Sequence, residues 1–547
     1  MQNCIIMQYR RNTVIRRDFL QNAIGGMAVA LPLGLAAQEP QQHPSSGLQT
    51  MRATGWINVR NFGATGDGST IDTPAVNRAI EAAAAQGGGT VLFPAGSYAC
   101  YTIRLKSHVG LHLEHGATIL AASVPDTGTT TGGYDPAGAP QPWEAYQDYG
   151  HNHWANSLIY GEGLEDLSIT GPGLIWGRGL SRGEADELPL AESPGVGNKA
   201  IALKNCRNLT IRDISILMGG HFAILLTGVD NVILDGLRID TNRDGIDIDC
   251  CRNVRVSNCA INSPWDDAIC PKSSFALGYA RATEGVTISD CYVTGAYEYG
   301  SMLSGVWKPK IYSEERKAAG RIKCGTESNG GFKNITIANC VFDRCRGLAL
   351  ETVDGGTIED ITVTNISMRG LVHPPLFLRI GSRMRGPAGI QPGTLRRVLI
   401  SNLTSSDSVA EYPSVICGIP GTLIEDVKIN DVYLHQLGGG STQWAGLQPP
   451  ENDRGYPEAS MFGMLPATGF FVRHVRNLAL GNVEIATAKA DARPAIWAED
   501  VDGLDCFRLR IPRGSTAFSL RHVRDFRNFG GQGSRDISEA VVNSAKY

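Results

Sequence analysis

One short unit, a strand followed by a polar turn and a second strand, recurs along the chain and constrains the fold more than any other feature of the sequence. In each copy an Asn, Asp or Gly precedes alternating apolar residues. The copies begin at Asn208, Asn231, Asn253, Gly285, Asn334, Asp360 and Asp426. The first four copies are separated by 23, 22 and 32 residues, a spacing that is typical of solenoids.

The repeat predicts the fold class. A single unit is too small to bury its own apolar face, so neighbouring units must stack to form one continuous core. A β-sandwich or a propeller is the alternative, but propeller blades repeat at roughly 40 residues or more. We therefore expect an all-β, single-domain right-handed parallel β-helix over 56–530 and a C-terminal tail over 531–547.

An open solenoid end exposes core and strand edges, so it needs a cap. Asp72-Thr73-Pro74 opens a run of Ala, Val, Ile and Glu that continues to Ala85 and ends at Gly87. Asp72 or Thr73 can cap the first turn, Pro74 suits that turn, and Gly stops a helix. We expect a short helix here that covers the N-terminal end of the β-helix.

The first 37 residues have the features of a targeting segment. Arg16 and Arg17 precede an apolar run from Ala28 to Leu35. Twin arginines ahead of an apolar stretch are typical of a twin-arginine export signal, and this run is too short to span a bilayer comfortably. We expect a signal peptide over 1–37, a linker over 38–55, and a periplasmic or secreted protein without membrane contact after cleavage. An uncleaved membrane anchor is the alternative.

Charge and cysteine content narrow the partners and cofactors. The formal net charge of −4 argues against a nucleic-acid partner. Among the 13 cysteines, Cys206, Cys259, Cys291 and Cys340 occupy similar places in successive units, which suits stacked free thiols at least as well as disulfides. Because the sequence has no Cys-x-x-Cys pair, we expect no zinc site, and we expect no other cofactor.

A cluster of aspartates carries the clearest chemical signal. One coil measures 23 residues, and Asp244 plus 23 is Asp267, so these two carboxylates are expected one above the other. Parallel strands lie roughly 4.8 Å apart, and like charges that close repel and raise one pKa. Asp266 and Asp267 would face opposite sides of an ideal strand, but Pro264 favours a bend just before them. The alternative is that these residues only form turns or an outer ladder.

Three converging carboxylates suit the hydrolysis of a glycosidic bond. One protonated acid donates its proton to the leaving oxygen, and the ionised carboxylates orient and activate a water. When the water attacks from the opposite face, acid and base stand roughly 6.5–9.5 Å apart and the anomeric configuration inverts.

The residues around these aspartates resemble glycoside hydrolase family 28, the polygalacturonase family. That family shows Asn-Thr-Asp-Gly-Ile-Asp, then Asp-Asp about one coil later, then Gly-His-Gly and Arg-Ile-Lys. This chain has Asn242-Arg243-Asp244-Gly245-Ile246-Asp247, Asp266-Asp267 and Arg321-Ile322-Lys323, and the resemblance covers most of the chain from about Trp56. It implies an inverting hydrolase that acts on an acidic, galacturonate-containing polysaccharide or oligosaccharide.

The resemblance also implies roles for single residues. Asp266 would be the general acid, and Asp244 and Asp267 would hold and activate the water. Arg321 and Lys323 would bind a substrate carboxylate, which an arginine can do with two hydrogen bonds.

Three further residues are candidates for substrate binding. Asp247 belongs to the first motif, and Lys272 follows the paired aspartates, although Lys272 suits a salt bridge to Asp249 equally well. Gly-His-Gly has no counterpart, because no histidine lies between the paired aspartates and the Arg-Ile-Lys motif. Residues 297–301 lie nearest its expected place, and a tyrosine there or Glu298 could replace the histidine.

Two other functions compete with hydrolysis. In a calcium-dependent β-helix polysaccharide lyase, the aspartates would be oxygen ligands of the metal. In a non-catalytic β-helix that only binds glycans or cell surfaces, they would have no chemical role. Glu351 is a further candidate for an exposed acid.

Overall fold

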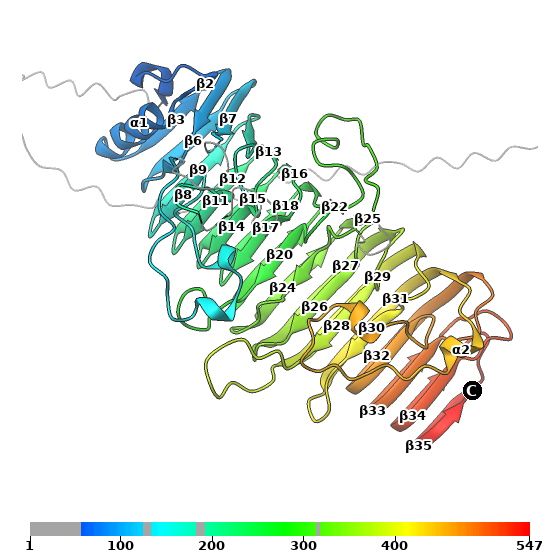
Figure 1. Cartoon of the computed structure of the whole chain (residues 1–547). Helices are drawn as coiled ribbons and strands as arrows, with labels where there is room; N and C mark the ends of the chain where they lie inside the picture. The colour runs from blue at the N-terminus through cyan, green and yellow to red at the C-terminus, as the bar shows by residue number, and fades with distance from the viewer. Residues whose placement is uncertain (1–55, 124–132, 182–190, 192, 313–317) are drawn as a thin grey trace, which may run out of the picture. The chain divides into compact units, whose positions relative to one another are not determined.

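Strands of successive coils pair in parallel in this computed structural model, which describes residues 56–123, 133–181, 191, 193–312 and 318–547. The predicted signal peptide (1–37) and linker (38–55) lie outside the described residues. The strands form three ladders whose members lie side by side from coil to coil (Figure 1). This pairing confirms the prediction of a parallel β-helix.

The three ladders contain most of the strands. The first ladder contains β1 (Trp56–Asn58), β3 (Gly89–Phe93), β6 (Val109–Leu113), β9 (Glu165–Thr170), β12 (Arg207–Arg212), β15 (Asp230–Asp235), β18 (Arg252–Ser257), β21 (Thr283–Ser289) and β24 (Phe332–Ala338). The second contains β2 (Asp67–Ile71), β4 (Gly96–Cys100), β7 (Ala117–Ala121), β10 (Leu174–Trp176), β13 (Ser215–Leu217), β16 (Arg238–Asp240), β19 (Ala260–Asn262), β22 (Tyr292–Thr294) and β25 (Val341–Asp343). The third contains β5 (Ile103–Arg104), β8 (Ile159–Glu162), β11 (Lys199–Lys204), β14 (Phe222–Thr227), β17 (Asp244–Asp249), β20 (Ile269–Lys272), β23 (Lys323–Cys324), β26 (Leu348–Thr352), β28 (Leu376–Ile380) and β30 (Ser414–Cys417).

In the later coils, one long strand takes the place of two or three short ones. They are β27 (Thr357–Arg369), β29 (Thr394–Ser408), β31 (Ile424–Gly438), β32 (Phe470–Lys489), β33 (Ile496–Phe507) and β34 (Phe518–Phe529). Strand β27 pairs with both β24 and β25, so it continues the first and the second ladder in one strand.

The repeat unit fixes the register of the stack. Leu209 pairs with Val232, and Val232 pairs with Val254, so this inward position carries a buried apolar side chain in successive coils. The asparagines that open these units, such as Asn231, have φ near 57° in the left-handed region, which Asn tolerates better than most residues. The Asn231 amide donates to Asn208 at 2.9 Å, so the turns also bond to one another along the stack.

Helix α1 (Thr73–Ala85) lies at the N-terminal end of the stack and confirms the predicted cap. Val76 and Ile80 are buried members of the continuous core. The capping detail differs from the prediction, because Asp72 occupies the N-cap position but its side chain makes no hydrogen bond to the helix. Its carboxylate instead accepts hydrogen bonds from the backbone N–H of Thr65 (2.7 Å) and Gly66 (3.0 Å), which ties the preceding turn to the cap.

The C-terminal segment differs from the predicted tail. Residues 531–547 contain β35 (Ile537–Lys546), which pairs antiparallel with β34 and covers its edge. The loops carry short helices, namely η1 (Val59–Phe62), η2 (Glu144–Tyr146), η3 (Tyr149–His151), α2 (Thr442–Ala445) and η4 (Ala459–Phe462). Of the helices in the described part of the chain, none has the length and apolar content needed to cross a membrane.

The cysteines of the described residues are free thiols. All twelve, from Cys100 to Cys506, are buried and unpaired by disulfides. Cys259 and Cys291 lie at equivalent places beside the core, and the thiol of each donates to the backbone carbonyl two residues earlier. Of the two alternatives that the sequence left open, the structure therefore has the stacked thiols.

Candidate active site

Three aspartates from two adjacent coils meet at the start of strands β17 and β20. Ile246 pairs with Ile269, and the same offset places Asp244 beside Asp267. The backbone N–H of Asp267 donates to the Asp244 carboxylate at 3.1 Å. One carboxylate oxygen from each of Asp244, Asp266 and Asp267 lies within 4.8 Å of the others. The stacking that the 23-residue coil predicted is present.

A bend before β20 brings Asp266 and Asp267 to the same side. Residues 263–268 form no strand, and the Ser263 hydroxyl bridges this bend by bonding the carbonyls of Arg243 (2.5 Å) and Asp266 (3.0 Å). The two neighbouring aspartates therefore escape the alternation of an ideal strand. The Asp266 side chain remains 32% exposed, whereas Asp244 and Asp267 are buried.

The three carboxyl groups experience different electrostatic surroundings. Burial would raise the pKa of Asp267, but Lys323 at 3.0 Å and Arg321 at 2.9 Å outweigh it and lower that pKa to about 2. Burial raises the pKa of Asp244 well above its usual range, and the charges of Asp247 and Asp266 add to the increase. The site therefore holds one carboxylate that is ionised and one carboxyl that favours its proton.

Strand β17 and its neighbours place a second charge cluster beside the aspartates. The Lys272 ammonium lies 3.5 Å from Asp247 and 3.6 Å from Glu327. Burial raises the pKa of Asp247 to about 8 despite the nearby lysine. The anticipated partner Asp249 instead accepts hydrogen bonds from the backbone (2.8 Å) and hydroxyl (2.7 Å) of Ser274. Lys272 thus forms a salt bridge, but with different acids from the one that the sequence suggested.

Arg321 and Lys323 lie beside the aspartates, as their motif predicted, but both are buried and already paired. Arg321 bonds Asp267 through Nε and Glu458 through Nη2, and it lies 3.8 Å from Glu351. Glu351 is fully buried rather than exposed, and burial raises its pKa to about 7 although Lys323 and Arg321 oppose this. The cationic pair of the motif therefore neutralises acids of the protein itself.

The segment predicted to replace the missing histidine makes other contacts. Glu298 is exposed and forms an ion pair with Lys308 at 2.9 Å. The Tyr297 hydroxyl contacts Asp343 (3.4 Å) and Arg344 on the following coil. These contacts give neither residue a link to the proposed acid Asp266.

Several residues of the site were missed by the sequence reasoning. Arg243 donates a hydrogen bond to Asp266 at 3.1 Å. It stands where the family motif has Thr, and this departure from the motif is the sequence signal that could have identified it. Tyr456 and Glu458 come from the long segment between β31 and β32, and Glu458 is 137 residues from its partner Arg321, so no local pattern could have found them.

A metal ion fits the aspartate cluster poorly. Three oxygen atoms lie close enough together for one, but calcium prefers six to eight oxygen ligands. Both oxygens of Asp267 already face a cation, Arg321 on one and Lys323 on the other. A divalent ion here would be repelled by two fixed positive charges.

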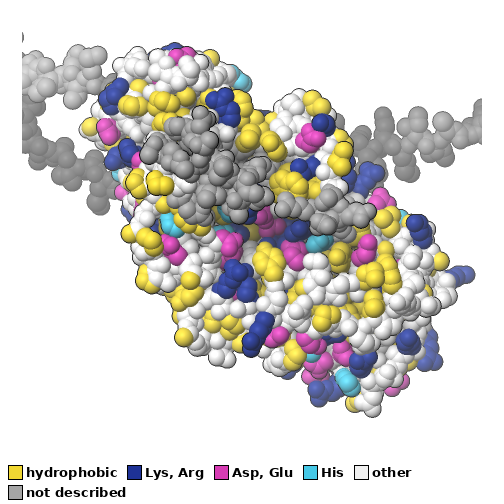
Figure 2. Space-filling model, viewed as in Figure 1, with side chains coloured by type: hydrophobic (Ala, Val, Ile, Leu, Met, Phe, Trp, Pro, Cys, Tyr) yellow, Lys and Arg dark blue, Asp and Glu magenta, His cyan; other side chains and the backbone are white. Residues whose placement is uncertain are grey.

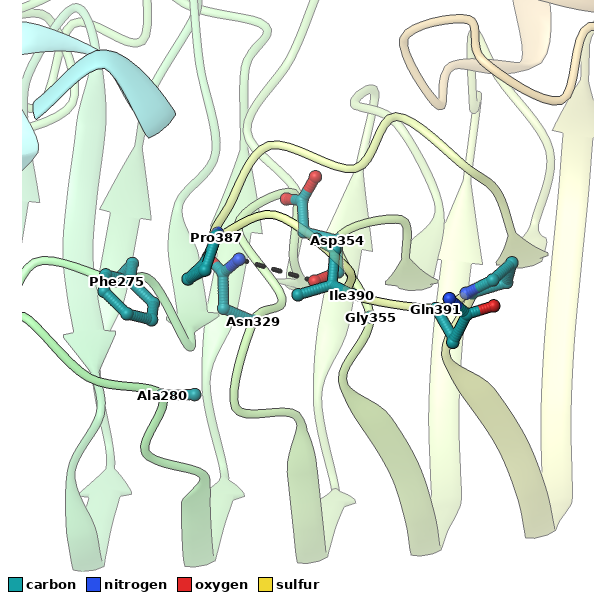
Figure 3. Close-up of a pocket in the computed structure, with 9 residues that line it drawn as sticks. Phe275, Ala280, Asn329, Asp354, Gly355, Pro387, Ile390 and Gln391 are labelled. Carbon is teal, nitrogen blue, oxygen red and sulfur yellow. Dashed lines mark hydrogen bonds between the residues drawn. The ribbon is translucent and has the colours of Figure 1, made fainter. Parts of the chain in front are cut away.

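A separate pocket lies further along the coils. It has a volume of about 330 Å³ and is lined by Phe275, Asn329, Asp354 and Ile390 among others (Figure 3). Asp354 binds Arg383, and Arg383 lies 4.0 Å from Glu327, the partner of Lys272. Ion pairs thus link this pocket to the charge cluster. Acidic and basic side chains also intermingle on the surface over the middle of the face shown in Figure 2.

Comparison with known proteins gives partial family matches. Residues 56–113 match a family model described as "Rhamnogalacturonase A/epimerase, pectate lyase-like". Residues 192–312, which include the aspartates, match one described as "Right handed beta helix region".

Curated relatives align over part of the chain. A probable polygalacturonase of Vitis vinifera is 27% identical over 321 residues, which cover 54% of this chain and 60% of the relative. Plasmin and fibronectin-binding protein A of Streptococcus pneumoniae is 34% identical over 190 residues, 33% of this chain and 24% of the relative. This chain therefore spans less than two thirds of the length of either relative.

A solved structure shares the fold. The family 28 exopolygalacturonase of Yersinia enterocolitica superimposes with a TM-score of 0.58 at 20% identity, over 82% of this chain and 78% of that one. At this identity the likeness shows the fold, which is the one predicted from the repeat.

Proposed function

We propose that this chain, a parallel β-helix similar in part to polygalacturonases, is an inverting glycoside hydrolase of pectic, galacturonate-containing polysaccharides or oligosaccharides. Asp266 protonates the leaving oxygen, and Asp244 and Asp267 hold and activate the attacking water. The observation that carries the proposal is the convergence of these three carboxylates from two coils within 4.8 Å.

The surroundings of Asp266 and Asp267 suit their proposed roles. Asp266 is the accessible member of the trio, so it can reach a glycosidic oxygen. Asp267 stays ionised because two cations hold its pKa low, and an ionised carboxylate can accept a hydrogen bond from water. The proposed acid, Asp266, and the proposed base, Asp267, are adjacent in sequence, and the bend before β20 lets both face the same side.

The separation of the carboxylates bears on the stereochemistry. One oxygen from each carboxylate lies within 4.8 Å of the others, which is shorter than the roughly 6.5–9.5 Å that is usual for inverting enzymes and closer to the roughly 5–5.5 Å of retaining ones. A retaining enzyme needs a free carboxylate to attack the sugar carbon. Asp267 is buried and fixed by Arg321 and Lys323, which favours a role in holding water over a role as nucleophile.

Release of reducing ends from pectic substrates tests the proposal. We expect Asp266→Asn to lower kcat by about 10²–10⁴, the usual contribution of a general acid. The matched control Asp505→Asn changes an exposed aspartate of β33 and should leave kcat unaltered. Equal activity of the Asp266→Asn variant and the wild type would refute the assigned acid.

A second candidate function is glycan or cell-surface binding without catalysis. The segment that is 34% identical to the pneumococcal plasmin and fibronectin-binding protein favours it. This function predicts that the Asp266→Asn variant binds its ligand as the wild type does while neither protein releases reducing ends.

We also propose that the protein is exported through a twin-arginine signal. Support comes from Arg16 and Arg17 ahead of the apolar run. Replacing both by lysine should move the protein from the exported to the cytoplasmic fraction, whereas the same change at the neighbouring pair Arg10 and Arg11 should not. Export of both variants alike would contradict the assignment.

A further inference from the structure

The Glu458 carboxylate lies beside Arg321, where the Arg-Ile-Lys motif is expected to bind a carboxylate of the substrate. One of its oxygens bonds Arg321 and also lies 2.9 Å from Arg346. Its other oxygen lies 3.1 Å from Nδ1 of His373. Three basic side chains therefore converge on Glu458, and together they lower its pKa well below the usual range even though burial opposes this.

Buried arginines anchor the segment that carries Glu458. Arg379 donates to the backbone carbonyls of Gly418 (2.7 Å) and Glu451 (3.1 Å). Arg473 donates to the carbonyl of Pro449 at 3.1 Å. Because these guanidinium groups also bond the backbone of the segment, its position does not depend on Glu458 alone.

The cations beside the aspartates are therefore already paired with acids of the protein. Nε of Arg321 faces Asp267 and its Nη2 faces Glu458, while the Lys323 ammonium faces Asp267. Both side chains are buried and paired with Glu458 and Asp267, so a substrate carboxylate beside them would face two like charges. Like charges placed side by side at a binding site disfavour the charged ligand.

An aromatic ring lies at the same place. Tyr456 is 54% exposed, its ring centroid lies 5.7 Å from the Lys323 ammonium, and its hydroxyl accepts a hydrogen bond from Thr326 at 3.1 Å. A fixed, half-exposed ring offers a flat apolar surface, which suits the face of a sugar without a charge.

We propose that the sugar bound beside Tyr456, on the Arg321 side of the aspartates, is uncharged, and that Glu458 excludes a free uronate there. The ligand class is a neutral sugar or an esterified uronate joined to a galacturonate on the other side of the scissile bond. The inference rests on the proposed hydrolase function and narrows its substrate.

Rates on three matched substrates test this specificity. They are a galacturonan oligomer, its methyl ester, and an oligomer in which galacturonate alternates with a neutral sugar. We expect wild-type kcat/KM to be higher for the methyl ester and the alternating oligomer than for the free acid. Glu458→Gln keeps the shape but removes the charge, and it should raise the relative rate on the free acid roughly tenfold, equivalent to about 1.4 kcal/mol.

The control Glu451→Gln changes an acid of the same segment that pairs with Arg473 and His474. It should leave unaltered the ratio of kcat/KM on the free acid to kcat/KM on the other two substrates. A wild type that prefers the free acid overturns the inference without any variant, and so does an unchanged ratio in Glu458→Gln. Cleavage of none of the three substrates overturns the proposed hydrolase and the inference with it.

Discussion

Removal of the Lys323 ammonium tests the electrostatic basis of the site. The ordinary carboxyl pKa of 3.8 falls to about 2 at Asp267 because Lys323 and Arg321 outweigh burial. At 1.36 kcal/mol for each pH unit, this is about 2 kcal/mol of preference for the ionised form. In Lys323→Met one of the two cations is lost while the burial remains, so the Asp267 pKa should rise by about 1–3 pH units.

The consequence for stability has a defined sign. In the wild type, the depressed pKa gives Asp267 a stabilising contribution that is present above pH 3.8 and is lost only as pH falls through about 2. Breaking a buried ion pair costs about 3–5 kcal/mol when the remaining charge stays ionised. At low pH the Asp267 of Lys323→Met takes up a proton and escapes that cost, so the destabilisation should be smaller at pH 3 than at pH 7.

Thermal unfolding of Lys323→Met and wild type across this pH range is the assay, with the acid limb of the activity profile as a second readout. The control Lys333→Met removes an exposed lysine 3.4 Å from Glu359, a type of pair worth only about 0–1 kcal/mol. A stability difference that is the same at both pH values, with an unmoved acid limb, would refute the reasoning.

Three further predictions follow from the structure. Because burial raises the Glu351 pKa to about 7, the wild type should lose stability as pH rises from 4.5 through 7, and Glu351→Gln should remove this part of the pH dependence of the melting temperature. Hydrolysis should persist in EDTA, because both carboxylate oxygens of Asp267 are paired with Arg321 and Lys323 and are not free to bind a metal ion. Loss of activity in EDTA that calcium restores would favour the lyase. Thiol titration of the unfolded protein without reductant should find all the cysteines from Cys100 to Cys506 reactive, and a deficit of two or more would indicate disulfides.

The elements set by short-range patterns were predictable from the sequence. The asparagine-led repeat gave the coil length, and the coil length alone placed Asp244 beside Asp267. Helix α1 followed from Pro74 and the alanine-rich run after it. In each case the determining residues lie within one coil or one helix, where periodicity and turn preferences act.

The contacts set by long segments were not predictable in this way. The path of the chain between β31 and β32 depends on Arg379 and Arg473 bonding its backbone, and no repeat encodes that path. As a result, the sequence suggested that Arg321 was available to bind a substrate carboxylate, whereas in the structure Arg321 bonds the Glu458 carboxylate. Strand β35 escaped prediction for a different reason, because its residues lack the repeat and pair antiparallel with the last coil.

The configuration of the first product tests the central claim most directly. We expect NMR of a pectic oligosaccharide digest, recorded before mutarotation, to show a new reducing end with inverted anomeric configuration. That result follows if Asp244 and Asp267 direct a water while Asp266 protonates the leaving oxygen. A first product of retained configuration, or an unsaturated sugar that absorbs in the ultraviolet, would contradict it.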